Sequence, residues 1–448
     1  MEIFDRDGET KMIKMIDMRQ GKDSGLFDRL VGRNRLGQDE VVKAVGEILS
    51  KVRADGDRAV LKYTEEFDKV KLVPYALKVS QQELEAAYDR VDPELLGVIR
   101  RAKANIEDFH KKQKQNSWFT TGKDGVLLGQ LYRPLEVIGI YVPGGTAVLT
   151  SSVLMNALPA RVAGVEKIIM ATPPRRDGSI DPAVLAAAQE AGVDEIYKIG
   201  GAQAIAAMAY GTETVPRVDK LFGPGNIYVA TAKRLVFGYC DIDMVAGPSE
   251  IAVVADDSAN PAYVAADLLS QAEHDALAAA ILVTPSEKLA AEVVKEIKMQ
   301  YGKLSRKNIL DKSLAEYSAA VIVNDLNDAV EMVNRIAPEH LELCIEEPFN
   351  YLPSVKNAGA IFLGHWSPEP LGDYFAGPNH VLPTGGTARF FSPLNVDDYM
   401  KKSSVISYTR KALEKVSRDI MLFAGSEGLD AHANSLGVRF GSPDEKLL

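Results

Sequence analysis

The spacing of apolar residues divides the chain into stretches of different texture. Between residues 39 and 114, apolar side chains such as Val41, Val45 and Ile48 recur at three- and four-residue steps. That spacing places them on one face of a helix, so it predicts amphipathic helices in this stretch. A helical texture returns after Phe390. The long middle of the chain has a different pattern.

In the middle of the chain, short apolar runs alternate with amphipathic helices in two successive sets. The first set predicts strands at 137–142, 167–171, 195–199 and 219–222, with helices starting near 151 and spanning 182–191, 202–210 and 227–237. The second predicts strands at 251–255, 280–283, 320–323 and 360–363, and helices at 263–274, 287–301 and 329–336. This alternation is typical of βαβ units. It predicts an α/β fold of two Rossmann-like lobes, each an incomplete doubly wound parallel sheet, with small helical N- and C-terminal units.

Composition narrows the class of protein. The 448 residues are 46% hydrophobic and 25% charged, which is ordinary for a globular protein, and no apolar run reaches the 18 residues of a membrane span. The net charge of −10 argues against nucleic acid as a partner. Cys240 and Cys344 are far apart, which excludes a disulfide scaffold and a thiolate zinc site. Residues 1–23 lack the apolar core of a signal peptide. We expect a cytoplasmic enzyme.

Three glycine-rich turns follow predicted strands of the first set. They are the segments 142–145, 200–203 and 223–226. Backbone amides in such turns can hold a dinucleotide phosphate. Each turn alone could equally be a structural turn without a ligand. In the last of them, Tyr228 replaces the third glycine of the GxGxxG pattern. Because the carboxyl ends of parallel strands meet at one edge of a sheet, the three turns together favour a nucleotide site there.

Histidines and carboxylates suggest further chemistry. Gln271 and His274 are three residues apart, which on a helix would place two metal ligands on one face. Glu339 and His340 are adjacent, the usual equipment for moving protons near neutral pH. The remaining candidates lie in a Gly- and Pro-rich loop and near the C-terminus: Asp373, His380, Glu427 and His432. His110 and His365 are interpreted as a surface-helix residue and a strand-end residue without a role.

Physical reasoning alone does not choose the reaction. The chain has no GxSxG elbow, and neither cysteine lies in a motif that would mark it as an activated nucleophile. A two-lobed α/β enzyme with a possible metal site and an acid–base pair is as far as the residues lead.

Taken together, the motifs closely resemble those of the histidinol dehydrogenase family. The matching segments are GIYVPGG at 139–145, SSVLMNALPA at 151–160, GGAQAIAA at 200–207, GPGNIYV at 223–229, AGPSE at 246–250, QAEHD at 271–275, APEHLEL at 337–343, GDYFAGPNHVLPTGGTAR at 372–389 and EGLDAH at 427–432. In order and spacing they cover nearly the whole chain beyond about residue 35. One departure is Thr150, where the family often has proline, and it touches no expected site residue.

The resemblance implies a zinc enzyme that completes histidine biosynthesis. It oxidises L-histidinol to L-histidine through an aldehyde-level intermediate with two NAD⁺. The resemblance assigns one zinc ion per subunit to Gln271, His274, Asp373 and His432. It makes His340 the base for the substrate hydroxyl and Glu339 the activator of water. Ser249, His340 and Glu427 contact the substrate beside the zinc ligands, whereas Tyr141, Gln203 and Asn226 line the NAD site.

The resemblance also implies a homodimer in which the C-terminal segment of one subunit completes the active site of the other. We therefore expect four regions. Residues 1–34 form an N-terminal arm. Residues 35–140 and 249–392 form the catalytic, metal-binding lobe, residues 141–248 form the NAD-binding lobe, and residues 393–448 form a helical unit that reaches the partner. Glu427 and His432 belong to that last unit.

Other functions remain open on the sequence. A related zinc- and NAD-dependent enzyme acting on another small polar alcohol, such as a sulfonated diol, would differ around APEHLEL and GDYFAGPNH, which here are of the biosynthetic type. A zinc hydrolase, with Glu339 activating water and no NAD, would leave the glycine turns without a role. A metal-binding scaffold without catalysis would not need the acid–base pair.

Overall fold

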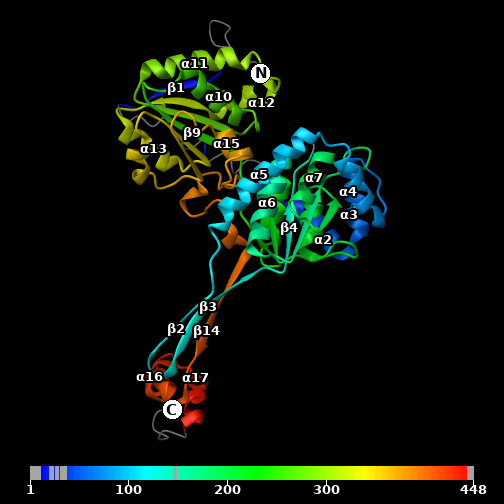
Figure 1. Ribbon diagram of the computed structural model, residues 1–448, viewed down its shortest axis with the longest axis vertical. Coiled ribbons are helices and arrows are strands. Elements are labelled where there is room, and N and C mark those ends of the chain that lie inside the picture. The colour runs from blue at the N-terminus through cyan, green and yellow to red at the C-terminus, as the bar shows by residue number, and fades with distance from the viewer. Residues whose placement is uncertain (1–11, 20–24, 26–29, 31–37, 145–148, 441–448) are drawn as a thin grey trace. The chain divides into compact units, whose positions relative to one another are not determined.

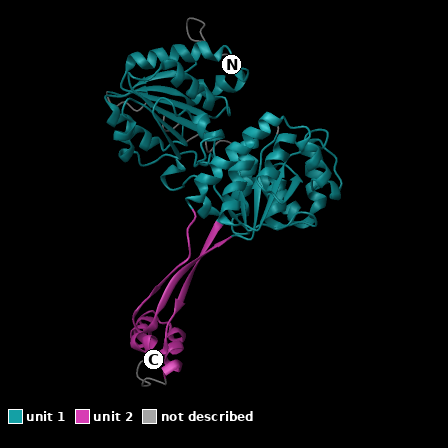
Figure 2. Ribbon diagram, in the orientation of Figure 1, with its two compact units in different colours: residues 1–113, 135–399 teal, residues 114–134, 400–448 magenta. Residues whose placement is uncertain are grey.

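The computed structural model describes residues 12–19, 25, 30, 38–144 and 149–440. The chain forms two compact units (Figures 1 and 2). Unit 1 comprises residues 1–113 and 135–399, and unit 2 comprises residues 114–134 and 400–448. Unit 1 holds two separate parallel sheets, and each is covered by the helices that connect its strands.

The first parallel sheet of unit 1 has the strand order β6-β5-β4-β7-β8. Its strands are β4 (Val137–Tyr141), β5 (Lys167–Thr172), β6 (Glu195–Lys198), β7 (Lys220–Phe222) and β8 (Asp241–Ile242). The connecting helices are α6 (Thr150–Ala163), α7 (Pro182–Glu190), α8 (Gly201–Tyr210) and α9 (Ile227–Val236). All pairs are parallel. The first strand, β4, is central, and the order reverses between β4 and β7, as in a doubly wound sheet.

The N-terminal helices pack onto this first sheet. They are α2 (Gln38–Asp55), α3 (Asp57–Tyr63), the π-helical turn η2 (Thr64–Asp68), the short η3 (Pro74–Ala76), α4 (Gln81–Tyr88) and α5 (Pro93–Lys111). Val45, Val52 and Val60 share a buried core with Ile205 of α8. The predicted division instead grouped residues 35–140 with 249–392. An amphipathic pattern shows that a helix has a buried face, but not which sheet covers that face.

The second parallel sheet repeats the strand order of the first. Its order is β1-β11-β10-β9-β12-β13, again entirely parallel, with β9 central. The strands are β9 (Glu250–Ala255), β10 (Ala279–Thr284), β11 (Ala319–Ile322), β12 (His340–Cys344), β13 (Ala360–Leu363) and, at the edge, β1 (Lys14–Asp17). The helices are α10 (Pro261–Ala272), α11 (Glu287–Tyr301), α12 (Lys307–Lys312), η5 (Ser313–Tyr317), α13 (Leu326–Ile336), α14 (Pro348–Tyr351), η6 (Leu352–Ser354) and α15 (Glu369–Tyr374). The short η7 (Thr387–Arg389) and η8 (Val396–Tyr399) end the unit.

The sequence did not predict β1 or β12. All five residues of β12 are buried, but His340 and Glu342 interrupt its apolar pattern with polar side chains. A buried strand that contributes polar residues to a buried polar cluster has no continuous apolar run, so its hydrophobic pattern does not predict it. The predicted helix 263–274 also ends early, at Ala272, so His274 lies in the turn that follows. The other predicted strands and helices of both sets are present within a few residues.

Unit 2 contains a three-stranded antiparallel sheet and two helices. Its strands are β2 (Trp118–Thr121), β3 (Leu127–Pro134) and β14 (Met400–Ser407), in the order β14-β3-β2, with η4 (Lys123–Gly125) between β2 and β3. The helices are α16 (Arg410–Ser426) and α17 (Asp430–Phe440). The predicted helical texture after Phe390 is therefore correct for α16 and α17 and wrong for β14. No helix in the described ranges is both long and apolar enough to cross a membrane.

Candidate active site

The adjacent Glu339 and His340 lie at the amino end of β12, beside the first residue of β9. The Glu339 carboxylate accepts a hydrogen bond from the backbone N–H of Glu250, 2.9 Å from Oε2. The His340 ring places Nδ1 3.2 Å from the backbone oxygen of Glu250. A carbonyl oxygen only accepts, so Nδ1 carries a hydrogen and donates it. In the neutral ring, Nε2 therefore holds the lone pair and can take up a proton.

The free nitrogen of His340 faces two carboxylates of α15. Nε2 is buried and has no hydrogen-bond partner among the described residues. It lies 3.8 Å from Oδ1 of Asp373 and 4.0 Å from Oε1 of Glu369. The sequence identified Asp373 but missed Glu369. The only local signal was its spacing, since Glu369 precedes Asp373 by four residues, about one helical turn.

Burial and charge shift the pKa of both members of the pair. Burial raises the pKa of Glu339 to about 7. Burial alone lowers the pKa of His340, but the negative charges of Glu339 and Asp373 outweigh it and raise the pKa to about 10. Both groups thus titrate far from their usual ranges, which is common where side chains exchange protons with a substrate.

Three of the four predicted metal ligands, Gln271, His274 and Asp373, lie at this edge of the sheet, together with Glu369, which was not predicted. His274, Glu369 and Asp373 each offer a ligand atom, and these atoms lie within 4.8 Å of one another. Gln271 is fully buried, and both its amide nitrogen and its amide oxygen lack a hydrogen-bond partner among the described residues. Imidazole, carboxylate and amide groups with unused lone pairs fit a divalent cation such as zinc.

A buried glutamate on β12 holds the helix that carries Glu369 and Asp373. Oε1 of Glu342 accepts a hydrogen bond from the Glu369 backbone N–H at 2.7 Å, at the start of α15. The preceding Pro368 supplies no side-chain cap. Burial and the nearby charge of Asp267 raise the pKa of Glu342 well above its usual value. Because His340 and Glu342 are two residues apart on one strand, they face the same side, and Glu342 sets where α15 lies over His340.

The predicted cofactor residues lie at the carboxyl ends of strands in the first sheet. The hydroxyl oxygen of Tyr141 accepts a hydrogen bond from the Gly201 backbone N–H at 3.0 Å. Gly223 has a φ of 107°, and a Cβ there would lie 2.1 Å from the Tyr141 backbone oxygen, so only glycine fits this turn. Asn226 accepts hydrogen bonds from the Tyr228 and Val229 N–H groups and begins α9. Tyr141 and Asn226 thus fix the backbone of the two turns at which α8 and α9 begin.

Comparison with known proteins places the chain in a family. Residues 31–440 match the sequence model for "Histidinol dehydrogenase". The chain belongs to the histidinol dehydrogenase family. Histidinol dehydrogenase from Clostridium acetobutylicum is 52% identical, with 97% of each chain covered. The enzyme from Listeria monocytogenes is 57% identical over 90% of this chain and 93% of the relative. The crystal structure from Elizabethkingia anophelis superposes with a TM-score of 0.90 at 39% identity, covering 96% of this chain and 98% of that one.

The remaining residues singled out from the sequence are divided between the two units. Glu427 and His432 are exposed residues of unit 2, whereas the cluster around His340 belongs to unit 1. Ser249 directly precedes β9, and its backbone oxygen accepts a hydrogen bond from Ala279. His380, to which no role was given, is partly buried, with Nδ1 3.1 Å from the Asp373 backbone oxygen. His365 follows β13, as expected of a strand-end residue.

The interpretation of His110 as a surface residue is wrong. Its side chain is fully buried at the end of α5, and Nδ1 lies 2.7 Å from Oε1 of Gln113. The helix was correctly predicted, and three lysines, at 111, 112 and 114, follow His110 closely. The ring instead turns to the inner face of the helix, where burial lowers its pKa.

Proposed function

We propose that this chain oxidises L-histidinol to L-histidine with two NAD⁺, in the last step of histidine biosynthesis in the cytoplasm. One observation supports this chemistry above the others: the buried, unpartnered Nε2 of His340 lies beside a cluster of metal-ligand atoms in a chain of the histidinol dehydrogenase family. The product of the first step is an aldehyde-level intermediate. The second NAD⁺ oxidises its hydrate.

His340 and Glu339 would handle the two proton transfers. Once a bound zinc ion offsets the carboxylate charges that raise its pKa, His340 would accept the proton of the substrate hydroxyl at Nε2 while a hydride passes to the nicotinamide ring. Its Nδ1–H remains bonded to the Glu250 backbone oxygen, which keeps the ring in the required tautomer. Glu339 accepts a proton from the water that adds to the aldehyde carbon. Each residue is anchored to a backbone group of Glu250, so both keep their positions through the two steps.

Gln271, His274 and Asp373 would hold a zinc ion together with His432. When bound, zinc supplies a positive charge that anchors the imidazole and amino nitrogens of the substrate and offsets the negative charge of Asp373 beside His340. Gln271 fits this role because both polar atoms of its buried amide are otherwise unused. Glu369 lies beside these residues and adds a second carboxylate next to both Asp373 and His340.

The NAD⁺ would bind at the carboxyl edge of the first sheet. Tyr141 and Gly223 flank the point where the strand order reverses, which is the usual ligand position in an open parallel sheet. Gln203 lies in the first turn of α8 and is almost completely buried, with neither amide atom hydrogen-bonded to described residues. Asn226 lies at the same edge, where its side chain caps the start of α9.

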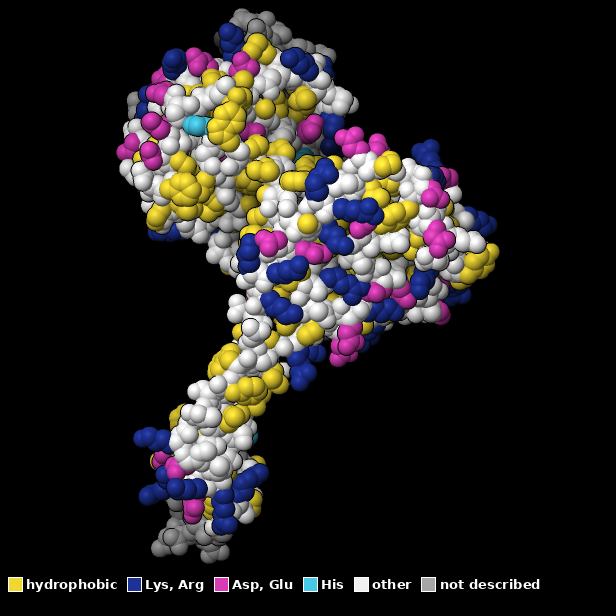
Figure 3. Space-filling view, in the orientation of Figure 1, with side chains coloured by type: hydrophobic (Ala, Val, Ile, Leu, Met, Phe, Trp, Pro, Cys, Tyr) yellow, Lys and Arg dark blue, Asp and Glu magenta, His cyan; other side chains and the backbone are white. Residues whose placement is uncertain are grey.

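A homodimer would supply the missing ligand and the missing substrate contact. Unit 2 exposes many large apolar side chains: Trp118, Phe119, Leu128, Ile406, Leu422, Phe423 and Val438. Figure 3 shows hydrophobic side chains along the strands of this unit. Surfaces of this kind mark interaction sites. We propose that these side chains pack against a second subunit. Glu427 and His432 of each subunit would then complete the active site of the other.

The deciding experiment counts NADH formed per L-histidinol consumed, with chelator and with zinc added back. Two NADH per substrate, lost with chelator and restored by zinc, are expected. One NADH per substrate would remove the water-activating role of Glu339. No NADH from a folded, zinc-bound protein would contradict the proposed function and favour another substrate or a hydrolase.

A further inference from the structure

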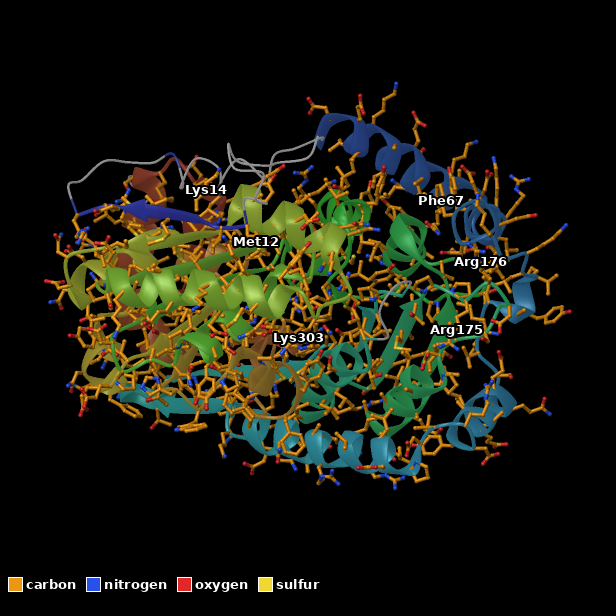
Figure 4. The ribbon with its side chains drawn as sticks, turned by 90° about the horizontal axis from the view of Figure 1, so that it is seen from above. Met12, Lys14, Phe67, Arg175, Arg176 and Lys303 are labelled. Carbon is orange, nitrogen blue, oxygen red and sulfur yellow. The ribbon has the colours of Figure 1, made fainter. Side chains whose placement is uncertain are left out.

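A carboxylate far away in the sequence lies beside the glycine turn that begins α8. Asp68 is the last residue of η2, and a Cβ at Gly200 would lie 3.1 Å from its Oδ1 and 3.3 Å from its Oδ2. The same Cβ would lie 2.7 Å from Pro173, in the segment after β5. Figure 4 labels Phe67, next to Asp68, in the lobe that also carries Arg175 and Arg176. Asp68 therefore lies at the carboxyl edge of the first sheet.

The side chain of Asp68 is partly buried, and one of its carboxylate oxygens has no compensating interaction within the described part of the chain. Oδ2 is buried and has no hydrogen-bond partner among the described residues. Arg175 is paired with Asp181 rather than with Asp68. Burial raises the pKa of Asp68 to about 6, so its charged form is destabilised in the fold. Buried carboxylates are normally paired or hydrogen-bonded, so this one is better explained by a ligand than by stability.

The neighbouring side chains also have unused hydrogen-bonding groups. Gln203 is 1% exposed, and neither its Nε2 nor its Oε1 has a hydrogen-bond partner among the described residues. A Cβ at Gly201 would lie 2.8 Å from this Oε1, so Gln203 folds back over the turn at Gly201, the residue after Gly200. Gly200 and Gly201 have no side chains to block a ligand. The turn thus combines an acceptor-only carboxylate with an amide that both donates and accepts.

We propose that Asp68 accepts hydrogen bonds from the adenosine ribose hydroxyls of NAD⁺ and thereby selects NAD⁺ over NADP⁺. A carboxylate matches a pair of hydroxyl donors, whereas it repels the 2′-phosphate of NADP⁺. A free phosphate is a poor alternative occupant for the same electrostatic reason. This inference rests on the proposed NAD⁺-dependent function and adds a specificity-determining residue that no motif in the sequence indicated.

The test measures dissociation constants of NAD⁺ and NADP⁺ for the zinc-loaded, full-length protein by calorimetry. For wild type we expect clearly tighter binding of NAD⁺ than of NADP⁺. Asp68→Asn should weaken NAD⁺ binding roughly 10- to 100-fold, the usual loss for a hydrogen bond to a charged group, and should reduce or abolish the preference over NADP⁺. Glu65→Gln is the matched control, since it removes one exposed charge from the same turn, and both constants should stay unchanged.

Several outcomes would overturn the inference. If wild type binds NAD⁺ and Asp68→Asn retains both the affinity and the preference, Asp68 does not contact the ribose. If Asp68→Asn lowers the melting temperature or fails to fold, the carboxylate is structural, because removing an unpaired charge should leave the ligand-free protein at least as stable. If wild type binds no NAD⁺ at all, the proposed function itself fails, and the result is distinguishable from failure at Asp68 alone.

Discussion

The two parallel sheets of unit 1 have the same strand order but place their functional residues at opposite edges. In the first sheet, Tyr141 and Gly223 lie at the carboxyl ends of β4 and β7. In the second, Glu339 and His340 lie at the amino end of β12, next to the start of β9. Both pairs of strands flank the reversal of strand order in their sheet.

This difference shows that strand order does not by itself decide which edge is used. The carboxyl edge of the first sheet offers backbone amides at helix starts, which suit an anionic cofactor. The amino edge of the second sheet offers something else. There, the N–H and carbonyl groups of Glu250 fix a carboxylate and an imidazole, and the ends of connecting segments bring Gln271 and His274 nearby. Proton transfer needs such fixed side chains rather than an anion cradle.

The largest effect is expected from changes at the amino edge. Glu339→Gln and His340→Asn should each lower turnover by roughly 10²- to 10⁴-fold, since each removes a group that accepts a proton. Zinc content and NAD⁺ affinity should remain near those of wild type, because neither residue is a proposed zinc ligand and the proposed cofactor site lies at the other edge. Steady-state rates, metal analysis and NAD⁺ binding check this. Loss of metal in either variant would contradict the division of roles between the edges.

A complementary change at the carboxyl edge should affect the cofactor and spare the metal. Gly223→Ala forces a Cβ to within 2.1 Å of the Tyr141 backbone oxygen at a φ of 107°, and should weaken NAD⁺ binding by roughly 10- to 100-fold through a displaced turn. Gly238→Ala is its matched control, since Gly238 has a φ of 102° but no atom within 4 Å of the added Cβ. Equal NAD⁺ affinities for the two variants would mean that the turn does not hold the cofactor.

An intermediate effect is expected at Glu342, which acts through α15. Glu342→Leu leaves the Glu369 backbone N–H without its acceptor and should lower turnover about tenfold, with NAD⁺ affinity unchanged. Glu342→Gln keeps an oxygen acceptor and should retain most of the activity. The comparison of kcat and zinc affinity for the two variants tests whether Glu342 positions Asp373 beside His340. Equal losses of kcat in the two variants would mean that the charge of Glu342, and not its hydrogen bond to α15, is responsible.

The pH dependence of the second oxidation provides a smaller, graded test. Glu339 must be ionised to accept a proton from water, and its pKa is raised to about 7 from its usual 4.5. Its ionised fraction falls about tenfold for each pH unit below 7, so the rate should fall in the same way. This acidic limb of the pH–rate profile is measured as NADH formation from the aldehyde-level intermediate, supplied directly as substrate. Glu339→Gln should flatten it, and a limb near pH 4.5 in wild type would contradict the raised pKa.

Much of the fold follows from local patterns. The helices α11 and α7 and the strands β5, β10 and β13 were predicted within a residue or two, because their apolar spacing is complete within each segment. The adjacency of Glu339 and His340 is likewise a property of the sequence, as are the glycine turns. Such features need no knowledge of distant parts of the chain.

Only the tertiary structure decided which residues meet and at which edge. The tautomer of His340 depends on the Glu250 backbone oxygen, 90 residues away. Glu369 and Asp68 became candidates only once folding had brought them beside His340 and Gly200. The packing of α2 onto α8 and the pairing of β14 with β3 were also invisible, because sequence periodicity indicates a buried face or an extended segment without naming its partner. Partners are chosen by packing between distant segments, and those contacts decide the chemistry of both edges.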